Sequence, residues 1–210
     1  MADVRILDSL AAAVHLAALR DAKTHPDQFQ RHARVLGSLL AVDAIHDMPT
    51  EPIEVTTPLG TTAPSRRPAQ PVVAVPVLRA GLGLLPGVQD VLPFVAVGMV
   101  GLERHEDTHE PTEYYRKLPD LAGAWILMLE PMLATGGSAA AAIEALGEAG
   151  AAKCVVLSVV ATGVAVDRIT AAHPDVRIVT GAIDPELDEN AYIVPGLGDF
   201  GDRLFGTPHA

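Results

Sequence analysis

A loop of small residues near the middle of the chain has the composition of a phosphate-binding site. An apolar run over residues 124–129 ends at Glu130, and the loop 131–138 (Pro-Met-Leu-Ala-Thr-Gly-Gly-Ser) follows it. Glycines allow a tight turn and a close approach to a ligand. The Thr135 and Ser138 hydroxyls, with the free amides of the helix expected next, would bind phosphate oxygens. No Gly-Lys-Ser/Thr follows, which excludes the nucleoside-triphosphate loop. The alternative is an ordinary strand–helix turn capped by Ser138.

Arg79 is a second candidate for binding phosphate. It stands at the end of the apolar run 72–78 and is followed by the glycine-containing segment 80–83. An arginine at the end of a strand, beside glycines, suits bidentate contact with a phosphate group. A surface arginine without a role is the alternative.

The C-terminal segment 192–207 is dense in glycine and contains Asp199 and Asp202. Such a segment presents backbone amides and carbonyls, and these groups suit the polar edge of a flat nucleobase. The alternative is a turn-rich tail whose Asp202 and Arg203 lie on a solvated surface.

Two matches to known motifs fail on their context. His105-Glu-Asp-Thr-His109 has the letters of a zinc-binding helix, but it lies in the charged segment 103–111, which predicts a surface loop. Gly196-Leu-Gly-Asp-Phe-Gly201 has the letters of a dinucleotide-binding turn. Only nine residues follow it, too few for the helix and second strand of that unit.

Short apolar runs that alternate with helix-like segments must position these residues. Runs that are apolar throughout are typical of strands covered on both faces, so the pattern predicts an α/β fold with a mostly parallel central sheet flanked by helices. The expected strands are 72–78, 94–100, 124–129, 153–160 and 177–182, and the expected helices are 6–19, 28–45, 138–149 and 165–172. Residues 48–70 predict extended or hairpin structure with a loop around 61–68.

We expect one domain over residues 1–210. It would comprise N-terminal helices in 1–47, a core over about 70–182 and a small C-terminal hood over about 183–210. Hydrophobic residues make up 49% of the chain, which is typical of a folded domain. Cys154, the only cysteine, lies in an apolar run and is expected to be buried.

The net charge of −11 argues against nucleic acid or an anionic membrane as a partner. Charges and prolines interrupt the longest apolar region, 71–102, which excludes it as a membrane span. No clear secretory signal precedes the first expected helix, so we expect a cytoplasmic protein.

Taken together, these segments resemble the uracil phosphoribosyltransferase family, whose members have the type I phosphoribosyltransferase fold. The matching pieces are 75–83 (Val-Pro-Val-Leu-Arg-Ala-Gly-Leu-Gly), 131–138, 182–184 (Ala-Ile-Asp), 192–199 (Tyr-Ile-Val-Pro-Gly-Leu-Gly-Asp) and 201–207. The phosphate loop alone indicates only the wider superfamily, whereas the C-terminal pattern is specific to this family.

The resemblance implies that uracil displaces pyrophosphate from 5-phosphoribosyl 1-pyrophosphate (PRPP) and yields UMP, with Mg²⁺ as cofactor. The implied PRPP-binding residues are Arg79, Arg104, Glu130, Pro131, Met132, Leu133, Ala134, Thr135, Gly136, Gly137, Ser138 and Asp199. The implied uracil-binding residues are Ile193, Gly198, Asp199 and Phe200. Arg104 and Asp199 would act electrostatically, because such transfers need no protein nucleophile. A homodimer or larger assembly is also implied, and some relatives are activated by GTP.

Two of the departures from the family pattern lie among the implied site residues. Glu130 stands where the family usually has aspartate, and Phe200 stands beside the base where it usually has alanine. The Phe200 ring would either occupy the uracil pocket or point away from it. These departures leave two alternatives open: a relative that accepts another base, and a non-catalytic binder of PRPP or a nucleotide with a regulatory role.

Overall fold

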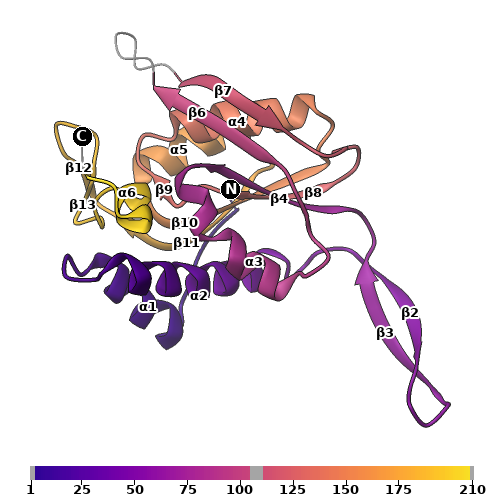
Figure 1. Ribbon diagram of the computed structural model, residues 1–210. Helices are drawn as coiled ribbons and strands as arrows, with labels where there is room; N and C mark the ends of the chain where they lie inside the picture. The colour runs from indigo at the N-terminus through magenta and orange to yellow at the C-terminus, as the bar shows by residue number, and fades with distance from the viewer. Residues whose placement is uncertain (1–2, 105–110, 209–210) are drawn as a thin grey trace.

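A mostly parallel sheet forms the centre of the molecule (Figure 1), of which the computed structural model describes residues 3–104 and 111–208. The main strand order is β1-β11-β10-β8-β4-β6-β7. These strands are β1 (Asp3–Ile6), β11 (Arg177–Asp184), β10 (Lys153–Thr162), β8 (Trp125–Leu129), β4 (Val72–Leu78), β6 (Met99–Arg104) and β7 (Pro111–Lys117). The short strands β5 (Ala96–Val97) and β9 (Met132–Leu133) pair with β4 and β10. Within this sheet the described strand pairs are all parallel except β6 with β7, which confirms the predicted fold class.

Helices cover both faces of this sheet (Figure 1). One face carries α1 (Leu10–Arg20), α2 (Pro26–Ala44), α3 (Leu85–Val91), the short 3-10 helix η1 (Ala80–Gly83) and α6 (Phe200–Phe205). The other face carries α4 (Gly137–Glu148) and α5 (Gly163–Ala172). Successive residues of β8 enter the two cores in turn: Leu127 and Leu129 enter one, Ile126 and Met128 the other. This burial on both faces explains why the strands are apolar throughout.

The N-terminal segment differs from the prediction, because the chain begins with a strand and not with a helix. β1 pairs in parallel with β11 at the edge of the sheet. The helix expected from residue 6 begins at Leu10, where the Ser9 hydroxyl accepts a hydrogen bond from the Ala12 amide at 3.1 Å. A four-residue strand that alternates charged and apolar residues has no local signal strong enough to reveal a partner about 170 residues away.

The expected loop around 61–68 is also wrong. Residues 62–68 form β3 (Thr62–Pro68), which pairs antiparallel with β2 (Thr50–Thr56) in a separate two-stranded hairpin that projects from the body of the molecule (Figure 1). Proline is tolerated there because both strands of a two-stranded hairpin are edge strands.

The region from 94 to 111 departs from the prediction too. The single strand expected over 94–100 is divided into β5 and β6 on either side of Gly98. Within the expected surface loop 103–111, residues 103–104 end β6 and residue 111 begins β7. The His105–His109 motif lies outside the described residues.

Cys154 is buried on β10, as the sequence indicated. Burial raises the pKa of its thiol to about 12, so the thiol stays protonated and unreactive in the folded protein. In the part of the chain that the structure describes, no helix combines the length and hydropathy that a membrane crossing requires.

An ion pair at the start of β11 gives a testable pH dependence of stability. The Arg177 guanidinium donates to both carboxylate oxygens of Asp47, one at 2.7 Å, and holds the pKa of that carboxyl at about 2. Because the pKa is lower in the folded state, the ionised carboxylate stabilises the protein at pH values above the unfolded pKa of 3.8. This stabilisation is lost as the pH falls towards 2. Because the Asp47 side chain is 44% exposed, we expect the pair to contribute less than about 1 kcal/mol to the free energy of unfolding.

The check is urea unfolding of the wild type and of Arg177→Gln across this acidic range. We expect the difference in free energy of unfolding between them to shrink as the pH falls. A difference that is constant with pH would show that the pair makes no pH-dependent contribution.

Candidate active site

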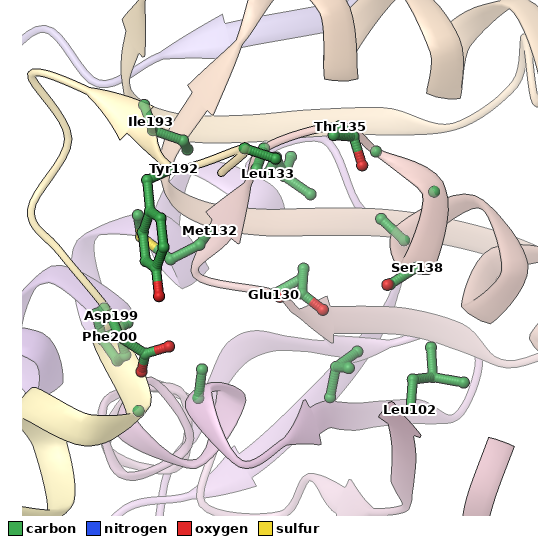
Figure 2. A pocket seen from close by; sticks show the side chains of 18 of the residues that line it. Leu102, Glu130, Met132, Leu133, Thr135, Ser138, Tyr192, Ile193, Asp199 and Phe200 are labelled. Atoms are coloured by element: carbon green, nitrogen blue, oxygen red, sulfur yellow. The ribbon is translucent and has the colours of Figure 1, made fainter. Parts of the chain in front are cut away.

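A cavity of about 430 Å³ opens at the carboxyl ends of β4, β6 and β8, where open α/β sheets bind ligands. Figure 2 shows Glu130, Ser138, Tyr192 and Asp199 around this opening. The lining comes from the end of β4 and the start of η1 (77–80), from Leu102, from Glu130, from the loop and helix start (132–139) and from the tail (190–193 and 198–201). Three segments that are far apart in the sequence, each of which was predicted to bind a substrate, therefore meet here.

The small-residue loop turns tightly at Gly136, just before α4. Gly136 is left-handed (φ 75°, ψ −1°) and immediately precedes α4. A Cβ atom at Gly136 would lie 3.0 Å from the Cα and carbonyl oxygen of Ala165. Ser138 makes no cap hydrogen bond and lies inside α4, so the alternative in which it caps the helix is wrong. The first-turn amides of α4 have no acceptors within the helix, and they lie at the cavity.

A buried threonine from the next strand fixes the loop. The Thr162 hydroxyl donates to the Ala134 carbonyl at 2.6 Å and accepts from the Ala165 amide at 3.1 Å. Thr162 is 1% exposed. The loop is thus tied to the start of α5, and its position does not depend on a ligand.

Glu130 and Pro131, at the start of the loop, face in different directions. The Glu130 amide donates to the Leu157 carbonyl at 3.1 Å, while its side chain lines the cavity. Pro131 is buried, and its carbonyl accepts from the Ser158 hydroxyl at 3.0 Å and the Val159 amide at 2.9 Å. The structure therefore places Pro131 behind the cavity wall, whereas residues 132–138 all line it.

Arg79 lies at the cavity and contacts the C-terminal helix. The Leu78–Arg79 peptide bond is cis. The guanidinium donates to Asp202 Oδ1 at 2.9 Å, and the Thr207 hydroxyl donates to the same oxygen at 2.6 Å. The Asp202 side chain is only 14% exposed. The Arg79 side chain is 53% exposed and keeps donors available to a ligand.

The tail is a folded part of the cavity wall, and the alternative of a solvated tail is wrong. Asp199 caps α6 by accepting from the Asp202 amide at 2.8 Å. Arg203 donates to the carbonyls of Leu197 (2.7 Å), Asp21 (2.6 Å) and Leu19. Burial lowers the pKa of Arg203, although Asp21 opposes this effect.

The Phe200 ring points away from the cavity, which was one of the two orientations that the sequence left open. It is 1% exposed and packs edge-on against Phe29, with the ring centroids 5.0 Å apart. A Cβ atom at Gly83 would lie 2.8 Å from Phe200 Cε1. The ring thus packs in the core beneath the tail, and Phe200 is also one of the residues that line the cavity.

Other lining residues were not singled out from the sequence. The largest is Tyr192, which is 47% exposed and directs its ring towards the cavity in Figure 2. The others include Leu102 on β6 and Asn190 before β13 (Ile193–Val194), a strand that pairs with β12 (Glu186–Leu187). The place of Tyr192 beside Ile193 in the matching segment was the available signal. Arg104 ends β6, but its side chain lies outside the described part of the chain.

Two carboxylates at the cavity are candidate ligands of a metal ion. Glu130 and Asp199 both line it. No group of three or more metal-ligating side chains occurs among residues 3–104 and 111–208. One or two carboxylates together with substrate phosphates are the usual ligands of Mg²⁺. The residues present therefore fit an ion that arrives with a phosphorylated substrate.

Comparison with known proteins agrees with this geometry. The uracil phosphoribosyltransferase family model matches residues 6–207. The uracil phosphoribosyltransferase of Symbiobacterium thermophilum is 41% identical over 208 residues, which are 99% of this chain and 100% of that protein. The one from Kineococcus radiotolerans is 45% identical over 206 residues, 96% and 98% of the two chains. The solved structure of the AQ2163 protein from Aquifex aeolicus superimposes with a TM-score of 0.93 at 32% identity and covers 99% of this chain and 100% of its own. With the phosphate loop, the strand-end arginine and the tail around one cavity, the chain belongs to the uracil phosphoribosyltransferase family.

Proposed function

We propose that the protein transfers the 5-phosphoribosyl group from PRPP to uracil and releases UMP and pyrophosphate. The observation that carries this proposal is the meeting of the phosphate loop 134–138, Arg79 and the tail 198–201 at one cavity of a chain that matches the family along its length. These parts correspond to three chemical groups of the substrates: the 5-phosphate of PRPP, its pyrophosphate leaving group and the base.

The 5-phosphate of PRPP would bind at the start of α4. The amides of Gly137 and Ser138 and the Thr135 hydroxyl supply donors there, and the helix dipole favours the negative charge. Glu130 lies beside the loop at the cavity wall, and its carboxylate would accept hydrogen bonds from the ribose hydroxyls.

Arg79 would bind the pyrophosphate group. The bond between C1′ and the pyrophosphate oxygen breaks, the bond between uracil N1 and C1′ forms, and the N1 proton leaves to solvent. Negative charge grows on the leaving oxygens, so a guanidinium held beside them lowers the barrier. The family resemblance implies that Arg104 would act together with Arg79. Mg²⁺ bound to the pyrophosphate would neutralise part of its charge, and Asp199 and Glu130 are the described carboxylates near enough to the cavity to assist.

The base would bind at the tail. Ile193 is 5% exposed and lines the cavity, where it would form an apolar wall. Backbone groups of Gly198 to Phe200, which also line the cavity, would bind the polar edge of the base. Because the Phe200 ring packs against Phe29 in the core, it would leave space in the cavity for a pyrimidine. This placement supports uracil over the alternative in which the ring reshapes the base site.

The test is an assay of purified protein with PRPP, Mg²⁺ and radiolabelled uracil, with and without GTP. We expect labelled UMP that depends on protein and PRPP. Absence of UMP under all these conditions, with PRPP binding still detected by calorimetry, would overturn the proposal in favour of another base or a regulatory role.

Glu130→Asp is expected to retain or raise the activity. It restores the carboxylate position that the family usually has, and it removes one methylene from a side chain at the cavity wall. Steady-state kinetics with PRPP as the varied substrate would check this. A loss of about a hundredfold, which an ångström-scale misplacement can cause, would show that the cavity has adapted to glutamate.

A further inference from the structure

The end of β11 carries a buried carboxylate that the reaction does not use. Asp184 is 5% exposed and receives two charge-assisted hydrogen bonds from Arg20, both at 2.7 Å. A third hydrogen bond comes from the Gly196 amide at 2.9 Å. Burial alone would raise the pKa of Asp184, but the bonds from Arg20 and Gly196 outweigh it and lower the pKa. The carboxylate is therefore ionised and fully engaged at neutral pH.

The same pair holds both backbone groups of one residue in the tail. Asp184 accepts from the Gly196 amide, and Arg20 donates to the Gly196 carbonyl at 2.8 Å. Gly196 has a φ of +52°, and a Cβ atom there would lie 2.0 Å from the Ile193 carbonyl oxygen. The chain thus makes a tight turn at Gly196, and the ion pair holds this turn through both the amide and the carbonyl of that residue.

Gly196 and its immediate neighbours do not line the cavity, but residues two and three positions away do. Ile193 precedes it by three residues, and Gly198 and Asp199 follow it by two and three. Arg203 holds the intervening Leu197 carbonyl at 2.7 Å. Backbone groups have no rotamers, so the position of a backbone donor or acceptor depends on how the chain around it is fixed. The ion pair sits at the point that fixes this segment.

We propose that Arg20 and Asp184 are positioning residues for base recognition: through Gly196 they set the backbone that contacts the base. The inference rests on the proposed uracil transfer at the same cavity. Loosening the pair should weaken the use of uracil and leave PRPP binding, which depends on the loop before α4, largely unchanged. The KM for uracil should therefore rise much more than the KM for PRPP.

β11 offers a matched control at its other end. Arg177 begins this strand and donates to Asp47 and Asp3, the latter at 2.6 Å. It does not line the cavity. Arg20→Lys and Arg177→Lys make the same chemical change, because each keeps the positive charge but loses the planar fork that bonds two acceptors.

The experiment measures KM for both substrates, kcat and Tm for the wild type, Arg20→Lys and Arg177→Lys. We expect Arg20→Lys to raise the KM for uracil about tenfold and the KM for PRPP by less than about threefold. Arg177→Lys should lower Tm without changing either KM. The neutral double variant R20Q/D184N avoids an unpaired buried charge and should show the same selective rise, so the result does not depend on one variant folding.

Two results would overturn the inference in an active wild type. One is an unchanged KM for uracil in Arg20→Lys with a fall in Tm like that of Arg177→Lys, which makes the pair structural only. The other is an equal rise of both KM values. A wild type that forms no UMP would instead overturn the proposed function, and this inference with it.

Discussion

Replacement of Arg79 by glutamine is expected to lower kcat by about 10²–10³-fold, the usual effect of removing one group that stabilises transition-state charge. Arg79 lies at the cavity with a half-exposed guanidinium, and Asp202 and Thr207 hold it from the side of α6. Glutamine keeps a polar side chain but carries neither the charge nor the fork that binds two phosphate oxygens. The measurement is the initial rate of UMP formation with both uracil and PRPP saturating.

Arg34→Gln is the matched control for Arg79→Gln. Arg34 also pairs with an aspartate, Asp90, through two hydrogen bonds of 2.6 and 2.7 Å, but it is exposed and does not line the cavity. Its loss should leave kcat unchanged, because exposed pairs contribute about 0–1 kcal/mol to stability. If Arg79→Gln kept kcat within about threefold of the wild type, its proposed role with the leaving group would be wrong.

Gly136→Ala is expected to lower kcat/KM for PRPP about a hundredfold. The left-handed backbone costs a residue with a Cβ atom about 1–2 kcal/mol, and that atom would lie 3.0 Å from the backbone of Ala165. The loop must shift away from α5, and a shift of about 1 Å in a substrate-binding group can cost about a hundredfold in rate. The measurement is steady-state kinetics with PRPP varied.

Gly147→Ala provides a control on the same helix. Gly147 lies in α4, and a Cβ atom there meets no atom within 4 Å. Alanine should therefore stabilise the protein by about 0.5–1 kcal/mol without a change in kinetics. An equal effect of both substitutions on kcat/KM would show that α4 as a whole, and not the geometry of the loop, governs PRPP binding.

The parts of the site that local chemistry marks could be predicted from the sequence. The loop 131–138 follows a buried strand and precedes a helix, so its composition and its place in the pattern indicate phosphate binding together. The apolar runs of β4, β8 and β10 indicate strands covered on both faces, and the parallel sheet follows from them. In each case neighbours along the chain carry the information.

Other features depend on contacts between distant segments. β1 is a strand because β11 offers it an edge, although its own four residues have little preference. The direction of the Phe200 ring depends on Phe29 and on the space left by Gly83, neither of which is near it in sequence. A solvated Arg203 was one alternative from the sequence, and only the fold brings the carbonyls of Leu19 and Asp21 to it as acceptors.

The Arg20–Asp184 pair shows most clearly which contacts cannot be predicted from the sequence. The two residues are 164 positions apart, and neither has a local pattern that indicates the other. Residue type and spacing along the chain were enough to indicate a phosphate loop, a parallel sheet and a family. Which side chains pair across the molecule, and so what holds the backbone that we propose binds the base, followed only from packing. Buried charges and aromatic rings are directed by the groups that the folded chain brings against them.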